Sequence, residues 1–210
     1  MFSWNDCSVR AIVPDYALLH PGYKFDFHYT GAMVRYRRNF VAGGTFFFTL
    51  TLRDRTSRVL VEHIDALREA FRAARDHCPF AIEAIVVMPD HLHVVMTLPP
   101  DDAGFASRIR FVKSRFSRRV AQAGAPIYRN SSGEYDLWQR RYWEHTIRDE
   151  EDLQRHVDYI HFNPVKHGHA KRAVDWPHSS IHRYIRAGWL NEDWAFGVEG
   201  DGADFGERPT

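Results

Sequence analysis

The fold is decided by residues 81–100, AIEAIVVMPDHLHVVMTLPP. Two runs rich in β-branched residues, 81–88 and 91–100, lie on either side of a short Pro-Asp segment. Pro89 fixes φ at a value that suits a turn, and Asp90 is a favoured turn residue. The stretch therefore predicts two antiparallel strands joined by a tight turn.

The second of these strands carries two kinds of side chain. His91 and His93 are two residues apart, so both leave the same face, and Leu92, Val94 and Met96 leave the other. We expect the apolar face to pack on helices and the histidine face to stay open. Two imidazoles can bind a divalent metal ion. A polar, solvent-facing sheet surface is the alternative for an isolated His-x-His pair.

The elements on either side complete a recognisable order. Residues 45–52 (TFFFTLTL) read as a first strand, and residues 57–76 as a helix with apolar residues at helical spacing. A second helix is expected at 103–122 and a fourth strand at 138–147. The order β-α-β-β-α-β predicts an α+β fold, a ferredoxin-like split βαβ domain with an antiparallel sheet and an added C-terminal helix.

The added helix begins after Asp149, an N-cap residue, and is expected to end at Asn163-Pro164; a short last helix follows at 179–187. It has an apolar seam and, beside the seam, a narrow polar stripe. If the seam packs beside the sheet, the stripe can face the histidines. Tyr159 would then be a nucleophile and Asn163 an amide ligand, whereas a tyrosine with its hydroxyl at the surface is the alternative. The seam is Leu153, Val157 and Ile160; the stripe is Asp152, His156, Tyr159 and Asn163.

Charge is unevenly distributed along the 210 residues. Lys and Arg total 28 and Asp and Glu 27, a net charge of +1. Residues 33–190 nevertheless hold 25 basic and 18 acidic side chains, and residues 191–210 hold six acids and one arginine. We therefore expect an N-terminal extension (1–32), a basic catalytic domain (33–190) and an acidic C-terminal tail (191–210), and the basic domain favours a polyanionic partner.

Cysteine content and hydropathy bear on location. Cys7 and Cys78 form neither a disulfide framework nor a CxxC motif. The sequence shows no signal peptide and no apolar run near the ~20 residues that span a membrane. A cytoplasmic protein that does not enter membranes is expected.

Four segments in a fixed order carry a family resemblance: RRNFVAGGTFFFTLTLRDR (37–55), VVMPDHLHVVMTLP (86–99), YDLWQRRYWEHTIRDEEDL (135–153) and YIHFNPVKHG (159–168). Together they resemble the REP-associated tyrosine transposases of bacteria. These are single-tyrosine HUH endonucleases, named for His, a hydrophobic residue and His. The resemblance covers residues 35–190 and leaves out both ends.

The resemblance implies a metal-dependent enzyme that cleaves and rejoins single-stranded DNA at REP-type hairpins through a 5′-phosphotyrosine intermediate, as in DNA transposition and recombination. The HUH pair falls on His91 and His93, the nucleophile on Tyr159 and the third metal ligand on Asn163. Mg²⁺ or Mn²⁺ is the implied metal. His156 is a candidate helper of the nucleophile, with a solvated surface histidine as its alternative. Related insertion-sequence enzymes are dimers that exchange the tyrosine helix, whereas REP-associated members are expected to be monomers.

Basic residues supply candidate DNA contacts, because Lys and Arg bind phosphates without regard to sequence. The helix at 103–122 carries six of them with no acid in between. A merely solvated basic face is the alternative. The candidates are Arg108, Arg110, Lys113, Arg115, Arg118 and Arg119, together with Arg35, Arg37, Arg38, Arg140 and Arg141.

Two other functions fit parts of the pattern. A non-catalytic module that binds single-stranded nucleic acid could use the same sheet. A metal phosphodiesterase that activates water would need the histidines but would form no covalent intermediate. Trapping a covalent protein–DNA adduct separates both from the transposase.

Overall fold

The computed structural model describes residues 40–195 of the chain. The expected extension (1–32), residues 196–210 of the acidic tail, and Arg35, Arg37 and Arg38 lie outside the described residues. Of the expected catalytic domain (33–190), residues 40–190 are described.

The centre of the protein is a four-stranded antiparallel sheet made of β1 (Thr45–Thr51), β2 (Ala81–Val87), β3 (His91–Thr97) and β4 (Trp143–Thr146). Its order is β2-β3-β1-β4, with every neighbouring pair antiparallel. This is the strand order of a ferredoxin-like split βαβ fold, so the expected fold class is confirmed.

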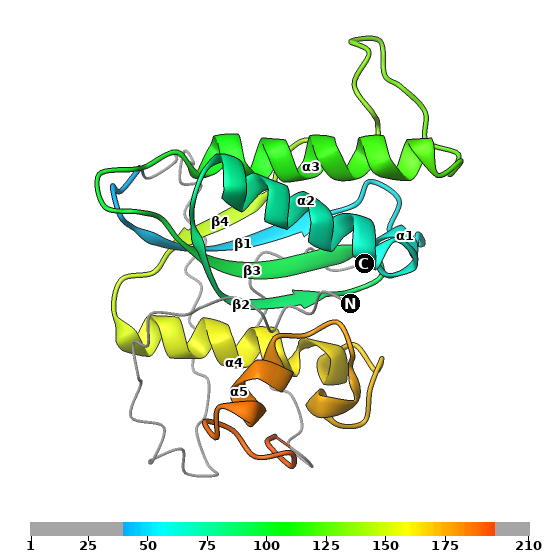
Figure 1. Cartoon of the computed structure of the whole chain (residues 1–210). Helices are drawn as coiled ribbons and strands as arrows, with labels where there is room; N and C mark the ends of the chain where they lie inside the picture. The colour runs from blue at the N-terminus through cyan, green and yellow to red at the C-terminus, as the bar shows by residue number, and fades with distance from the viewer. Residues whose placement is uncertain (1–39, 196–210) are drawn as a thin grey trace, which may run out of the picture.

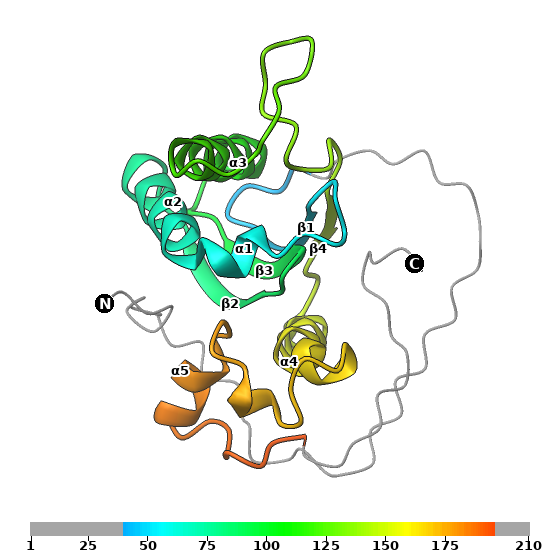
Figure 2. The same cartoon turned by 90° about the vertical axis from the view of Figure 1, so that its right-hand side faces the viewer.

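Helices cover both faces of the sheet (Figures 1 and 2). On one face lie α2 (Ile64–His77) and α3 (Phe105–Gln122), preceded by the short α1 (Val59–Glu62). On the other face lie α4 (Glu150–Lys166) and α5 (Ile181–Arg186), with the 3₁₀ turn η2 (Ala173–Asp175) between them in sequence. The sheet is therefore the middle layer of three.

The larger core lies between the sheet and α2 and α3. Alternation along β1 sends Phe46 and Phe48 into it, and alternation along β3 sends Leu92, Val94 and Met96. All five side chains are fully buried. The apolar face of β3 thus packs on two helices as expected.

The second core corrects the expectation of an open histidine face. Phe47 and Val95 leave the opposite face of the sheet and pack with Val157 and Ile160 of α4 and with Ile181 of α5. The apolar seam of α4 lies directly on the sheet and brings the polar stripe down with it. The histidine face is therefore the floor of a buried layer, and this enclosure was not evident from β3 alone.

Several boundaries differ from the expectation. The helix expected at 57–76 is split into α1 and α2 by His63, whose φ and ψ are −114° and 36°. The strand expected at 138–147 shortens to β4, with Trp138 forming only an isolated bridge to Leu52. Asp149 caps α4 as expected, because its carboxylate accepts a hydrogen bond from the Asp152 amide at 2.8 Å.

The expected end of α4 at Asn163-Pro164 is wrong, because the helix continues to Lys166 with Pro164 inside it. Proline removes its own amide hydrogen bond and crowds the carbonyl four residues earlier, yet it is a frequent rather than an obligatory stop. The last turn closes through hydrogen bonds from the His167 amide to the Asn163 carbonyl and from the Gly168 amide to the Val165 carbonyl. The extra turn places Lys166 and His167 next to the histidine pair.

Candidate active site

The floor of the site is the histidine pair of β3. His91 and His93 are 3% and 0% exposed, and their ring centroids are 4.9 Å apart. His91 Nδ1 lies 2.8 Å from Asp90 Oδ1, and His93 Nδ1 lies 2.9 Å from Thr49 Oγ1. A partner on Nδ1 orients each ring and directs Nε2 towards a ligand, which is the usual arrangement of metal-binding histidines.

Asp90 sets the tautomer of His91. Burial alone would raise the pKa of Asp90, but the hydrogen bond and charge of His91 and the ion pair with Arg55 hold that pKa at about 2. The carboxylate can only accept, so His91 Nδ1 carries the proton and Nε2 has the lone pair. Asp90 is thus both a turn residue and the group that prepares His91.

Tyr159 of α4 lies against this floor. Its ring centroid is 5.1 Å from that of His93 and 6.1 Å from that of Phe47, and both contacts are edge-on. Lys166 Nζ lies 5.0 Å from the centre of the Tyr159 ring. The tyrosine is 7% exposed, so its orientation is set by packing on three sides.

Asn163 lies between Tyr159 of α4 and His167, the residue that caps the end of α4, and both contact the histidine pair. Positions 159, 163 and 167 are successive turns of one helix face. Tyr159 contacts His93, and the His167 ring lies 5.5 Å from that of His91. The fully buried Asn163 therefore faces the same floor. Two imidazoles and an amide form a nitrogen and oxygen donor set that fits a divalent cation with open positions for substrate.

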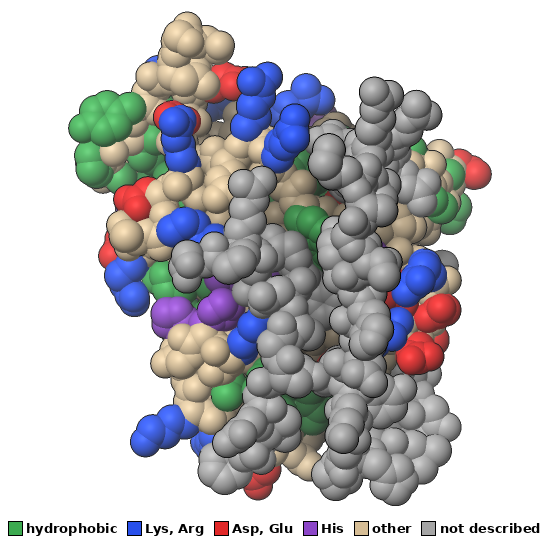
Figure 3. Space-filling view, turned by 180° about the vertical axis from the view of Figure 1, so that it is seen from behind, with side chains coloured by type: hydrophobic (Ala, Val, Ile, Leu, Met, Phe, Trp, Pro, Cys, Tyr) green, Lys and Arg blue, Asp and Glu red, His purple; other side chains and the backbone are tan. Residues whose placement is uncertain are grey.

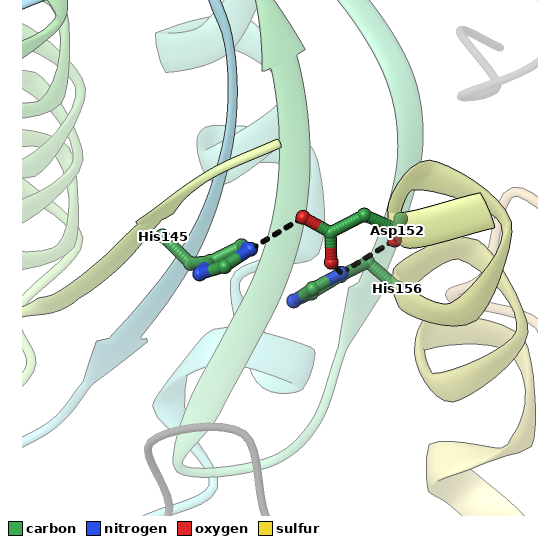
Figure 4. Close-up of side chains that lie close together, drawn as sticks. All are labelled: His145, Asp152 and His156. Carbon is green, nitrogen blue, oxygen red and sulfur yellow. Dashed lines mark hydrogen bonds and ion pairs between the residues drawn. The ribbon is translucent and has the colours of Figure 1, made fainter. Parts of the chain in front are cut away.

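A second polar cluster, His145, Asp152 and His156, lies beside the first (Figure 4). Its potential ligand atoms lie within 4.8 Å of one another, so the group could hold a metal ion. His145 Nε2 donates to Asp152 Oδ2 at 2.8 Å, and His156 Nδ1 donates to the Asp152 carbonyl at 2.7 Å. A carboxylate and a carbonyl only accept, so both nitrogens carry protons. A cation here would have to replace these hydrogen bonds.

His156 is not the solvated surface histidine that was one of its expected alternatives. It is 1% exposed, and burial lowers its pKa to about 4, so the ring is neutral near pH 7. Such a ring is a weak base. A role in holding Tyr159 suits its position better than a role in proton transfer.

The chain is similar to known proteins over the residues that form this site. A family model described as "Transposase IS200 like" matches residues 44–163, from β1 through Asn163. The REP-associated tyrosine transposase of Escherichia coli (strain K12) is 43% identical over 178 residues, which cover 84% of this chain and 98% of that protein. The chain belongs to the REP-associated tyrosine transposase family.

Two further similarities agree with this assignment. A Haemophilus influenzae protein assigned to the same family is 44% identical over 164 residues, 77% of this chain and 93% of that protein. A REP-associated tyrosine transposase solved in complex with a REP hairpin is similar over 85% of this chain and 99% of that one, with 41% identity and a TM-score of 0.72. The similarity therefore extends over nearly the whole length of these transposases.

An arginine and two histidines lie near the floor of this transposase at its His91 end. His167 and His169 are exposed at the end of α4, and Arg58 is exposed before α1. The pKa of His169 is lowered by partial burial and by the nearby charges of His167 and Arg58, which places these groups together. Figure 3 shows exposed histidines grouped on one face of the molecule with Lys and Arg side chains close by. We call Arg58, His167 and His169 the basic rim.

The expected DNA contacts on α3 fall into two groups. Arg108 is 3% exposed and paired with Asp102, and Lys113 donates to the Gln139 carbonyl while burial lowers its pKa to about 8. Arg115 and Arg119 both pair with Glu69 of α2, an acid that the local sequence of α3 does not reveal. The exposed residues Arg110 and Arg118 line a cavity of about 370 Å³ between α2 and α3. Figure 2 shows α2 and α3 on one face of the sheet and α4 on the other, so this cavity and Tyr159 lie on opposite faces.

Arg140 and Arg141 are exposed and lie nearer the floor. Thr51 pairs with His91 on one side, and on the other its carbonyl accepts a hydrogen bond from the Gln139 amide. The segment that carries both arginines therefore lies across β1 from His91, about 10 Å away at ordinary strand spacing.

Sequence reasoning missed several residues of the site. Thr49 and Phe47 share the histidine face of the sheet. The alternation along β1 could have indicated this, but it was used only to assign the opposite, apolar face. Asp90 was assigned to the turn alone, although a carboxylate next to a His-x-His pair is a common orienting partner. His145 had no local signal, because its partner Asp152 is on another element.

Asp158, next to the tyrosine, gives a stability prediction. Burial raises its pKa to about 7, against the hydrogen bond from Gln154 Nε2. The pKa of Asp158 in the folded protein exceeds the unfolded value of ~3.9. The contribution of protonated Asp158 to the free energy of unfolding is therefore full below pH ~4 and is lost as pH rises through 7. Asp158→Asn should therefore be more stable than wild type by about 2 kcal/mol at pH 8, with no gain at pH 4. Urea unfolding at both pH values measures this, and parallel pH dependences would contradict it.

None of the helices between residues 40 and 195 is both long and apolar enough to span a lipid bilayer.

Proposed function

We propose that this transposase cleaves and rejoins single-stranded DNA at a hairpin through a covalent bond to Tyr159. The observation that carries the proposal is the contact between Tyr159 and the histidine pair, with ring centroids 5.1 Å apart and His91 held by Asp90 in the tautomer that binds a metal. A nucleophile beside a prepared metal site is the arrangement that phosphoryl transfer requires.

The step itself is a transesterification. The Tyr159 phenol oxygen attacks the scissile phosphorus, the bond from phosphorus to the 3′ oxygen breaks, and that oxygen takes up a proton as a free 3′-OH. The 5′ phosphate stays on the tyrosine. The number of phosphodiester-type bonds is unchanged, so the 3′-OH of another strand can reverse the step without ATP.

We propose that His91, His93 and Asn163 hold Mg²⁺ or Mn²⁺. When bound, the ion withdraws charge from the scissile phosphate and offsets the charge that develops during transfer. Asp90 and Thr49 keep the two imidazoles oriented toward it. The packing of Tyr159 between His93, Phe47 and Lys166 holds its ring beside the histidine pair.

Lys166 should assist the nucleophile. A cation above a phenol ring favours loss of the phenol proton, and free tyrosine has a pKa near 10. Lys166→Met keeps the aliphatic stem and removes the charge, so the rate of adduct formation should fall about 10- to 100-fold. Lys171→Met, an exposed lysine five residues further on, is the matched control and should leave the rate within about twofold. Equal effects of the two would contradict the role.

The proposed DNA path follows the exposed cations near the floor. The basic rim, whose charge comes from Arg58, and the pair Arg140 and Arg141 lie around the histidine pair, where backbone phosphates can reach them. Arg110 and Arg118 lie beyond the sheet and are proposed as outer contacts. Binding of a REP-type hairpin is proposed from the relative solved with one. A protein that acts on such DNA is proposed to work in the bacterial cytoplasm.

A strand-cleavage assay tests the proposal. The substrate is a REP-type hairpin with a single-stranded flank, labelled at either end, with Mn²⁺ present. We expect a free 3′-OH fragment and a 5′ fragment that migrates with the protein in SDS. Cleavage without any protein-linked fragment would favour the water-using phosphodiesterase, and binding without cleavage would favour the binding module.

The enzyme is proposed to act as a monomer, because Tyr159 contacts the histidines of its own chain. A mixture of His91→Ala/His93→Ala and Tyr159→Phe chains should therefore stay inactive. Dimers that exchange α4 would restore one site in each mixed pair, or about one quarter of wild-type activity. Recovery near that value, measured by adduct formation, would contradict the monomer.

A further inference from the structure

The cluster of His145, Asp152 and His156 links α4 to the edge of the sheet. Asp152 is fully buried and accepts from His145 Nε2 of β4 at 2.8 Å and from the Arg148 amide at 3.1 Å. Burial alone would raise its pKa, but the hydrogen bonds from His145 and Arg148 hold that pKa at about 2. A buried carboxylate that joins two elements fixes their separation, because breaking it leaves a charge without its donors.

His156 extends this link toward the catalytic floor. Its ring stacks on the His145 ring with centroids 4.7 Å apart and planes 15° apart. On its other side the Phe47 ring lies 4.8 Å away. The Asp152 carbonyl fixes the orientation of the His156 ring through Nδ1. A row of ring contacts therefore runs from His145 through His156 to Phe47.

Phe47 connects the cluster to both catalytic groups. Its ring centroid is 5.4 Å from that of His93 and 6.1 Å from that of Tyr159. Asp152 and Tyr159 are seven residues apart on α4, two turns and about 10 Å along the helix axis. A shift of α4 at Asp152 would thus move Tyr159 relative to His93.

We propose that the His145–Asp152–His156 cluster is a positioning element, which holds Tyr159 at reacting distance over the histidine pair and acts through Phe47. The inference rests on the proposed function. It assigns the cluster a part in the rate of transfer and none in binding DNA, since its buried members Asp152 and His156 face the sheet (Figure 4). A misplacement of about 1 Å can slow a reaction about 100-fold, so the effect is measurable.

The test separates rate from affinity. Asp152→Asn removes the charge, and His145→Phe keeps the stacked ring but removes the donor. Both should slow adduct formation at saturating DNA by about 10- to 100-fold and leave the Kd for an uncleavable hairpin within about twofold. The amide nitrogen of Gln can replace Nε2 as a donor, so His145→Gln should slow adduct formation less than His145→Phe does. The variants are compared at a temperature where circular dichroism shows each to be folded.

Asp102→Asn is the matched control. Asp102 pairs with the buried Arg108 on the far side of the sheet, so its loss should lower thermal stability without changing the rate. The proposal would be overturned if Asp152→Asn and Asp102→Asn lost rate in equal proportion to their loss of thermal stability. An unchanged rate in His145→Phe would also overturn it. A metal ion retained by His91→Ala/His93→Ala but lost on further Asp152→Asn substitution would show an ion site instead. If wild type forms no adduct, the proposed function has failed rather than the positioning role.

Discussion

Tyr159→Phe should abolish the covalent adduct and strand cleavage, with a loss of at least about 10⁴-fold. The change removes only the hydroxyl. The ring keeps its contacts with His93 and Phe47 and remains under Lys166, so the fold and the hairpin affinity should be unchanged. Adduct formation is measured on SDS gels with labelled DNA, and affinity by fluorescence anisotropy.

Tyr184→Phe is the matched control for this change. Tyr184 is a buried tyrosine of α5 whose hydroxyl donates to the Glu83 carbonyl at 2.9 Å. Its loss should cost about 1 kcal/mol of stability and leave adduct formation intact. Activity that survives Tyr159→Phe, or that disappears equally in both variants, would contradict a special role for Tyr159.

His91→Ala and His93→Ala, singly or together, should reduce cleavage by about 10³-fold or more and remove Mn²⁺ binding. Each change deletes one imidazole from a donor set of three. Hairpin affinity should stay within about threefold, because the proposed phosphate contacts are exposed arginines and the basic rim, which these changes leave in place. Mn²⁺ binding is followed by electron paramagnetic resonance and cleavage by gel assay.

His77→Ala provides the comparison for the histidine variants. His77 is exposed at the end of α2, across the sheet from the site, and its ring stacks on Phe111. Neither Mn²⁺ binding nor cleavage should change in this variant. Cleavage by His91→Ala/His93→Ala at the wild-type rate would exclude the proposed metal site.

Much of the fold followed from the sequence because its signals are local. Alternation in residues 45–52 and 81–98 fixed the strands and the face that packs on α2 and α3. The Asp149 cap fixed the start of α4, and the seam of Val157 and Ile160 fixed the face that packs on the sheet. These features depend on side chains that are near one another in the chain, so the spacing of apolar residues in the sequence predicts them directly.

The site was only partly predictable because its supporting contacts are long-range. Strand alternation and the polar stripe identified the histidine pair and Tyr159 as candidates on facing surfaces, and the resemblance assigned their roles. Thr49 and His145 act through partners on other elements, and Glu69 neutralises two arginines of α3 from another helix. Helical periodicity cannot indicate such partners.

The paired arginines change the view of DNA binding. A helix with six basic residues suggested a principal DNA surface, yet four of them are buried or engaged within the protein. The exposed arginines near the floor are Arg58, Arg140 and Arg141, which lie on different segments, with His167 and His169 beside Arg58. Their charge is assembled by the fold, so no single segment reveals it.

The most direct measurement is to identify the residue that carries the DNA. The adduct formed by wild-type protein and a hairpin substrate is digested with nuclease and protease, and the modified peptide is sequenced by mass spectrometry. We predict a nucleotide attached through its 5′ phosphate to Tyr159. Attachment to a different residue, or cleavage that leaves no nucleotide on the protein, would contradict the proposed mechanism.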